Sequence, residues 1–175
     1  MQIADLDGFR VHYRVDGDPE GPPVVFANSL GTDLRLWDKV IPLLPQGLRY
    51  IRYDKRGHGL TDATPQPYAM GTLIRDAEAL LDHLGVRDAL FVGLSIGGMI
   101  GQAFALRHPE RVDRLVLSNA PSIMADELKP MWDQRIADVR EKGMESQVQM
   151  TLARWFTPDY AVANGATLDW IANMV

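Results

Sequence analysis

The chain has 175 residues, of which 46% are hydrophobic and 23% charged, and its 23 acidic and 18 basic residues give a net charge of −5. This acidic balance argues against nucleic-acid binding, which needs clustered Lys and Arg, and the absence of cysteine excludes disulfides and thiolate metal sites. The N-terminus has no signal-peptide pattern, and the longest uncharged run, residues 93–106, is too short to cross a bilayer, so we expect a cytoplasmic protein that binds neither metal nor membrane.

Strands and helices are predicted to alternate through the first two thirds of the chain. Residues 10–15 alternate between apolar and polar side chains, and the turn signal Asp7-Gly8 makes residues 2–5 their hairpin partner. Residues 23–28 form a continuous apolar run that is typical of a strand buried in a parallel sheet, and further strands are predicted over residues 48–54, 89–94 and 114–120. Apolar residues at helical spacing predict helices over residues 34–44, 70–84 and 96–108.

This order predicts an α/β fold with a mostly parallel sheet after an N-terminal β-hairpin, and with helices on both faces. No strand-like run follows residue 121. Helices are expected there instead, over residues 124–142, 144–155 and 167–175, with the sequence TPDY as a break between them. We therefore expect two parts, a core with six strands over residues 1–121 and an incomplete helical cap over residues 122–175.

A possible nucleophile lies between the third buried strand and the helix that follows it. Residues 93–97, Gly-Leu-Ser-Ile-Gly, match the pattern G-x-S-x-G in the strand-to-helix setting that a nucleophile elbow requires. The elbow strains the serine backbone, needs glycines where side chains would collide, and aims a helix N-terminus at developing negative charge. Ser95 is therefore the candidate catalytic residue. The alternative is a glycine-rich packing turn with a buried serine.

Acyl transfer also needs rigid N–H groups that bind an oxyanion. The backbone N–H of Ile96 follows the serine, and a second donor is expected in the loop after the first buried strand, at residues 28–31. We expect the backbone N–H of Leu30 to be that donor, and an ordinary strand-to-helix turn is the alternative. Another loop begins at Asp54 on the same side of the sheet, and Asp54 and Arg56 are expected to tie it down.

A serine hydroxyl needs a histidine to act as its base, and in this type of site the histidine follows the serine along the chain. The four histidines of the sequence are His12, His58, His83 and His108. The first three precede Ser95, and His58, in a glycine-rich loop, is expected to be structural. His108 lies at the far end of the predicted helix, about 18 Å from the serine at ~1.5 Å per residue.

The sequence resembles the α/β-hydrolases, and more narrowly the 3-oxoadipate enol-lactonases. The stretches that carry the resemblance are VHYRVDG, FANSLGTDLRLWD, IRYDKRGHGLTD, LFVGLSIGGMIGQAFALRHPERVDRLVLSNA and MWDQRIADVREKGME. Most α/β-hydrolases carry His-Gly where this chain has Asn28-Ser29, and this difference narrows the resemblance to the lactonases.

The resemblance implies a carboxylic-ester hydrolase without a cofactor that opens a small, carboxylated enol-lactone in the breakdown of aromatic compounds. Ser95 would form an acyl-enzyme, and the N–H groups of Leu30 and Ile96 would hold the oxyanion. In the cap, Arg135 follows Trp132 by three residues and so shares its helix face, where it would bind the substrate carboxylate beside an apolar wall. The alternative for Arg135 is a solvated position on a surface helix.

The family places its catalytic acid and histidine after later strands, and no histidine follows His108 here. The resemblance therefore implies the N-terminal portion of a hydrolase, truncated before the last strands and lacking triad catalysis. The strand at residues 114–120 would then expose an apolar edge through which chains self-associate. The alternatives are a carboxylesterase, a C–C bond hydrolase, a cofactor-free haloperoxidase, or a non-catalytic protein that binds a small molecule.

Overall fold

The computed structural model describes residues 1–6 and 8–175 and divides into two compact units, Met1–Ser122 and Ile123–Val175. The predicted turn at Asp7-Gly8 lies partly outside the described residues, because Asp7 is not among them. Among the helices of the described ranges, none is both long and apolar enough to cross a membrane.

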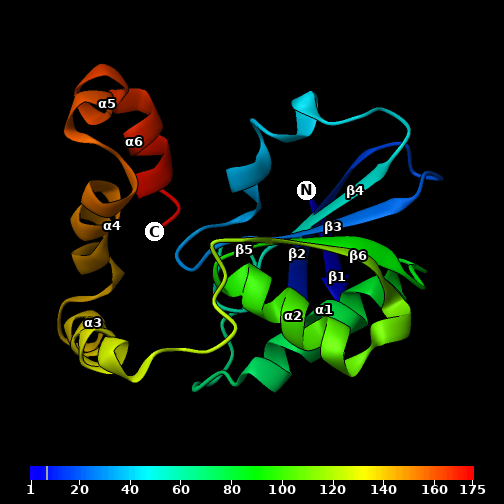
Figure 1. Ribbon diagram of the computed structural model, residues 1–175, viewed down its shortest axis with the longest axis horizontal. Coiled ribbons are helices and arrows are strands. Elements are labelled where there is room, and N and C mark those ends of the chain that lie inside the picture. The colour runs from blue at the N-terminus through cyan, green and yellow to red at the C-terminus, as the bar shows by residue number, and fades with distance from the viewer. Residues whose placement is uncertain (7) are drawn as a thin grey trace. The chain divides into compact units, whose positions relative to one another are not determined.

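The first unit is built on a six-stranded mixed sheet in the order β1-β2-β4-β3-β5-β6 (Figure 1). Its strands are β1 (Gln2–Asp5), β2 (Arg10–Gly17), β3 (Pro23–Ala27), β4 (Arg49–Tyr53), β5 (Ala89–Leu94) and β6 (Val112–Ser118). β2 pairs antiparallel with both β1 and β4, whereas β4, β3, β5 and β6 run parallel to one another. The predicted parallel sheet with an N-terminal hairpin is therefore confirmed.

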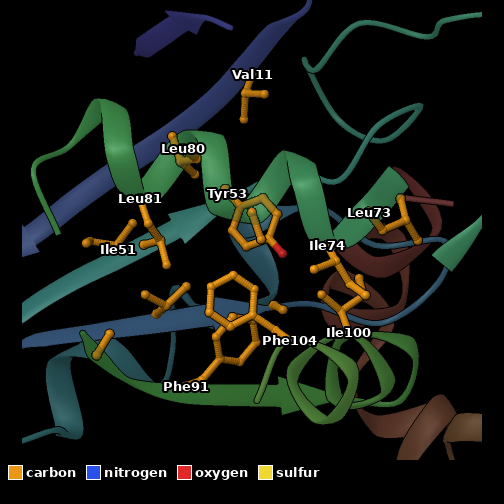
Figure 2. Packing of buried hydrophobic residues seen from close by; sticks show 14 of the residues in the cluster. Val11, Ile51, Tyr53, Leu73, Ile74, Leu80, Leu81, Phe91, Ile100 and Phe104 are labelled. Atoms are coloured by element: carbon orange, nitrogen blue, oxygen red, sulfur yellow. The ribbon is translucent and has the colours of Figure 1, made fainter. Parts of the chain in front are cut away.

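Two helices, α1 (Met70–His83) and α2 (Ile96–Arg107), cover one face of this sheet (Figure 1). Leu80 and Leu81 of α1 and Phe104 of α2 reach the main apolar core, where Phe91 of β5 stacks on Phe104 with ring centroids 5.8 Å apart (Figure 2). Each such side chain contributes roughly 1.5–3 kcal/mol when it is fully buried. This packing fixes α2, and so the turn that precedes it, against β5.

The opposite face of the sheet is covered by the segment between β3 and β4. A single helix over residues 34–44 was the prediction, and it is wrong, because the segment forms two 3₁₀ helices, η1 (Leu34–Trp37) and η2 (Ile41–Leu43). Pro42 has no N–H to donate and its ring clashes with a preceding turn, so an α-helix does not continue through it. The segment still buries Trp37, whose ring centroid lies 4.9 Å from that of Phe26 on β3.

β6 is the last strand in the order of the described sheet. It is paired on one side with β5, and its Val116 and Leu117 side chains are 47% and 43% exposed. A short 3₁₀ helix, η3 (Pro109–Arg111), leads into it from α2. The apolar edge that the sequence predicts at this strand is therefore present in the described part of the chain.

The second unit contains the helices α3 (Lys129–Lys142), α4 (Val148–Trp155), α5 (Pro158–Ala163) and α6 (Gly165–Ala172), with the short η4 (Asp126–Leu128) and η5 (Met144–Gln147). The chain does leave the helical conformation at Phe156 and Thr157, as the break predicted at TPDY requires, but the prediction missed the short helix α5 that begins at Pro158. Thr157 caps that helix by accepting a hydrogen bond from the Tyr160 N–H, and Pro158 occupies its first turn. Helices α4, α5 and α6 line an apolar cavity of about 290 Å³ that includes Leu152, Phe156 and Leu168.

Candidate active site

Ser95 lies at the turn between β5 and α2, with a φ of 55° and a ψ of −120°. A non-glycine residue in such a conformation costs on the order of 1–3 kcal/mol and persists only where its surroundings hold it. Here the Ser95 N–H donates to the carbonyl oxygen of Ser118 at 2.9 Å, and the Ser95 carbonyl accepts from the N–H groups of Gly98 and Met99. Its half-buried hydroxyl forms no hydrogen bond within the described ranges, so it is available for chemistry.

The glycines on either side of Ser95 are required by the closeness of the backbone. A Cβ atom at Gly93 would come within 3.0 Å of the Gly97 carbonyl oxygen, and one at Gly97 would come within 3.0 Å of the Ala27 carbonyl oxygen on β3. Real Cβ atoms do not make such contacts. The turn therefore requires glycine at both positions, as the sequence predicts for a nucleophile elbow.

Ile96 is the first residue of α2, and its backbone N–H points out of the start of the helix. The first N–H groups of any α-helix have no partner within the helix, and the positive end of the helix dipole lies among them. In the part of the chain that the structure describes, no acceptor is bonded to the Ile96 N–H. The group is thus a free donor next to the Ser95 hydroxyl.

The loop after β3 begins at the same end of the sheet as the Ser95 turn, because β3 and β5 are parallel neighbours with Ala27 opposite Gly93. Leu30 is 38% exposed, and its backbone N–H has no acceptor among the described residues. The N–H of the next residue, Gly31, is already used, since it donates to His58 Nε2 at 3.2 Å. The Leu30 N–H is therefore without an acceptor among the described residues, while the Gly31 N–H is occupied.

Hydrogen bonds from buried polar side chains hold the loop after β3 in place. Asn28 is fully buried, and its Nδ2 donates to the carbonyl oxygen of Thr32. The Thr32 hydroxyl donates to the carbonyl oxygen of Ser29 at 2.9 Å, and the Lys55 ammonium donates to that same oxygen at 2.8 Å. The loop is thus fixed by hydrogen bonds that come from within the protein.

The loop that begins at Asp54 is tied down by the two residues that the sequence indicates. The Asp54 carboxylate, 1% exposed, accepts from the N–H groups of Leu34 and Leu60 at 2.6 and 3.0 Å. The Arg56 guanidinium forms an ion pair with Asp76 of α1, at 2.5 Å between Nη2 and Oδ1. These contacts fix the β4 end of the site to the β3 loop and to α1.

No hydrogen bond joins any histidine of the described chain to Ser95. The lone pair of His58 Nε2 is engaged by the Gly31 N–H, and burial, together with the nearby Lys55, lowers the pKa of His58 to about 4. His12 Nδ1 lies 2.7 Å from Asp54 Oδ2, but β2 is three strands from β5, about 14 Å at ~4.8 Å per strand. His108 ends α2, at the opposite end from Ser95.

Trp132 and Arg135, the two candidates of the second unit, lie together on α3. The Arg135 guanidinium carbon is 4.7 Å from the Trp132 ring centroid, and Arg135 Nε donates to Gln147 Oε1 at 3.0 Å. Burial and the like charge of Arg154 lower the pKa of Arg135. Across residues 1–6 and 8–175, no carboxylate forms an ion pair with Arg135. The shared helix face predicted for this pair is therefore present, and it presents a cation without an acidic partner.

The sequence does not predict that Lys55 and Thr32 hold the loop after β3 through the Ser29 carbonyl oxygen. Lys55 is only 2% exposed although lysine is almost never buried without a partner. The sequence does indicate that Lys55 lies near the site, because it follows a buried strand, between Asp54 and Arg56, at the end of the sheet where the other loops of the site begin.

Comparisons with known proteins identify the family of this chain. A family model described as the alpha/beta hydrolase fold matches residues 22–164. The 3-oxoadipate enol-lactonase 2 of Acinetobacter baylyi is 36% identical over 150 residues, which are 86% of this chain and 55% of that enzyme. The crystal structure of the enol-lactonase from Burkholderia xenovorans is similar with a TM-score of 0.93 at 36% identity, covering 99% of this chain and 66% of that one.

A hydrolase from Pseudomonas aeruginosa is similar with a TM-score of 0.91 at 38% identity, covering 99% of this chain and 65% of that one. The chain therefore spans 55% of the length of the curated lactonase and about two thirds of the length of the two solved structures. With the family match over most of its residues, the chain belongs to the α/β-hydrolase fold family.

Proposed function

We propose that this chain carries the nucleophile and the oxyanion hole of a serine hydrolase that acts on small carboxylic esters or lactones. Ser95 Oγ attacks the carbonyl carbon, and the N–H groups of Leu30 and Ile96 bind the oxyanion that forms. The observation that carries the proposal is the strained Ser95. Among the described residues its hydroxyl has no hydrogen-bond partner, and the backbone N–H groups of Leu30 and Ile96 have no acceptor.

The substrate we propose is a five-membered enol-lactone with a carboxylate arm, derived from an aromatic compound. Attack by Ser95 Oγ forms an ester to the serine and breaks the ring C–O bond, which releases an enolate. The serine hydroxyl gives up its proton to solvent, and the enolate takes up one proton on carbon to become a ketone. Water then hydrolyses the acyl-serine and regenerates the hydroxyl. The likeness to enol-lactonases supports this substrate.

The reaction also needs a general base that takes the proton of the Ser95 hydroxyl. No described histidine is hydrogen-bonded to Ser95, and the sequence has no histidine after His108. We therefore propose that the 175-residue chain by itself reacts slowly, by oxyanion stabilisation and binding alone, which retain about 10³–10⁴-fold catalysis over water in hydrolases that lack their triad.

An acylation experiment with an added base tests the function. The chain is incubated with p-nitrophenyl acetate and imidazole, and its intact mass is measured before the ester hydrolyses. We expect one acetyl group that maps to Ser95, that depends on imidazole and that is absent from Ser95→Ala. The matched control is Ser118→Ala, which removes a neighbouring serine hydroxyl and should still be acetylated. Equal acetylation of the parent and Ser95→Ala would contradict the proposal.

We also propose that two copies of the chain associate through β6. The support is that β6 has a strand on one side only in the described sheet, and that Val116 and Leu117 are exposed there. Unpaired N–H and C=O groups of an edge strand form a template for an identical edge.

A further inference from the structure

The Leu30 N–H belongs to the same peptide group as the Ser29 carbonyl. Among the described residues the one cis peptide bond is Gln66-Pro67, so the Ser29–Leu30 peptide is trans. In a trans peptide the carbonyl and the N–H point in opposite directions within one plane. Whatever fixes the direction of the Ser29 carbonyl therefore also fixes the direction of the Leu30 N–H.

Two side chains fix that carbonyl, and both are buried. The Lys55 ammonium donates to it at 2.8 Å and the Thr32 hydroxyl donates to it at 2.9 Å. Lys55 is 2% exposed and Thr32 is fully buried, so the carbonyl is drawn toward the protein interior. The N–H of Leu30 is then directed the other way, toward the sheet edge where it meets no acceptor from the described chain.

The charge of Lys55 adds a second effect to this orientation. A cation that binds a peptide oxygen polarises the amide, and hydrogen bonds in series strengthen one another inside a protein. A polarised Ser29–Leu30 peptide makes the Leu30 N–H a better donor to a developing oxyanion. A buried ammonium is costly, and burial lowers the pKa of Lys55 to about 7, although the nearby Asp54 and Asp33 oppose that shift.

We propose that Lys55 is a positioning residue for the oxyanion hole: its ammonium, together with the Thr32 hydroxyl, holds the Ser29–Leu30 peptide so that the Leu30 N–H faces the oxyanion. The inference rests on the proposed function in one respect, the role of Leu30 as a donor. The direction of the peptide itself does not depend on that role, and this allows the two to be tested separately.

The ionisable groups that face Lys55 come from two segments, its own loop and the start of η1. Asp54 precedes it, Asp33 caps η1, and His58 lies in the same loop. The two carboxylates favour the ammonium, while burial disfavours it more strongly. His58 is neutral near pH 7, because its pKa is about 4, so its charge does not change where Lys55 titrates.

The first test measures the peptide directly by NMR on the isotopically labelled 175-residue chain. The Ser29 carbonyl ¹³C, the Leu30 amide ¹⁵N and the Lys55 Nζ resonances are followed through a pH range centred on about 7. We expect all three to shift with one midpoint, and the Ser29 and Leu30 shifts to disappear in Lys55→Met. The matched control Lys142→Met, which removes an exposed lysine, should keep them. Static Ser29 and Leu30 resonances while Lys55 titrates would overturn the inference, and no variant is needed for that outcome.

The second test measures the oxyanion hole with phenylboronic acid, whose tetrahedral adduct with a serine carries an oxygen in the oxyanion position. We expect Lys55→Met and Thr32→Val each to weaken binding on the order of 10-fold or more, as loss of one oxyanion donor does. Thr32→Ser keeps the hydroxyl and should bind as the parent does. If Ser95→Ala binds as well as the parent, the proposed function fails, and the NMR titration still decides the role of Lys55. If binding needs Ser95 but is unchanged in Lys55→Met, the function stands and the inference is wrong.

Discussion

Gly97 of α2 packs so closely against Ala27 of β3 that a methyl group at position 97 would meet the Ala27 carbonyl oxygen within 3.0 Å. The contact joins the first turn of the helix to the strand that leads into the Leu30 loop. It therefore sets the distance between the two halves of the proposed oxyanion hole.

Replacement of this glycine should damage both stability and the site. We expect Gly97→Ala to lower the free energy of unfolding by about 1–3 kcal/mol, because α2 must move away from β3 to admit the methyl group. Urea denaturation measures the effect. Gly165→Ala is the matched control, since a Cβ at Gly165 meets nothing within 4 Å, and it should be neutral or stabilising. Equal stability of the Gly97 variant and the parent would show that α2 is not held against β3 as described.

The strain at Ser95 predicts a gain of stability when the residue is removed. Glycine adopts a φ of 55° at little cost, so we expect Ser95→Gly to raise the free energy of unfolding by about 1 kcal/mol while it abolishes acylation. The comparison is Ser118→Gly on β6, where glycine weakens a strand and should destabilise. A destabilised Ser95→Gly would mean that the serine is not strained in the folded chain.

The pKa of His58 predicts a loss of stability in acid. Its value in the folded chain is about 4, below its ordinary 6.5, so the unfolded chain binds more protons between these two values. The free energy of unfolding should therefore fall as the pH drops from about 6.5 toward 4. We expect His58→Gln to flatten this part of the pH profile and His83→Gln, at an exposed histidine, to leave it unchanged. An unaltered profile in His58→Gln would contradict the burial of a neutral His58.

The exposed edge of β6 predicts a concentration-dependent assembly. We expect the chain to elute from size exclusion above its monomer mass, and Val116→Lys to shift it toward monomer, because a charge on an edge strand opposes pairing. Leu106→Lys, at an exposed position of α2, is the control and should not shift it. A monomeric parent across the concentration range would remove the proposal.

Much of the fold could be predicted from local patterns. The strand predicted over residues 89–94 is β5, and the helix predicted over residues 70–84 is α1. Both can be predicted because the periodicity of a strand or helix depends only on residues close in sequence. Pro42 was a visible warning against one helix over residues 34–44, and Thr157-Pro158 was a visible start for α5. Apolar spacing alone therefore mispredicts these two segments, because the residues that begin and end helices set their bounds.

The sequence predicts the Ser95 turn through its motif, but it does not predict the role of Lys55. The G-x-S-x-G spacing reports a backbone requirement, so it leads from the sequence to the strained turn at Ser95. The burial of Lys55 and its bond to Ser29, 26 positions earlier in the chain, depend on how β3 and β4 lie side by side. No local pattern carries that information, because a lysine at the end of a strand is exposed in most proteins.

The most direct measurement of the central claim is a crystal structure of the 175-residue chain with phenylboronic acid. We predict a covalent bond from boron to Ser95 Oγ and a boronate oxygen that accepts from the Leu30 and Ile96 N–H groups at about 2.7–3.1 Å. A boronate bound elsewhere, or one bonded to Ser95 with its oxygens turned away from both N–H groups, would contradict the account.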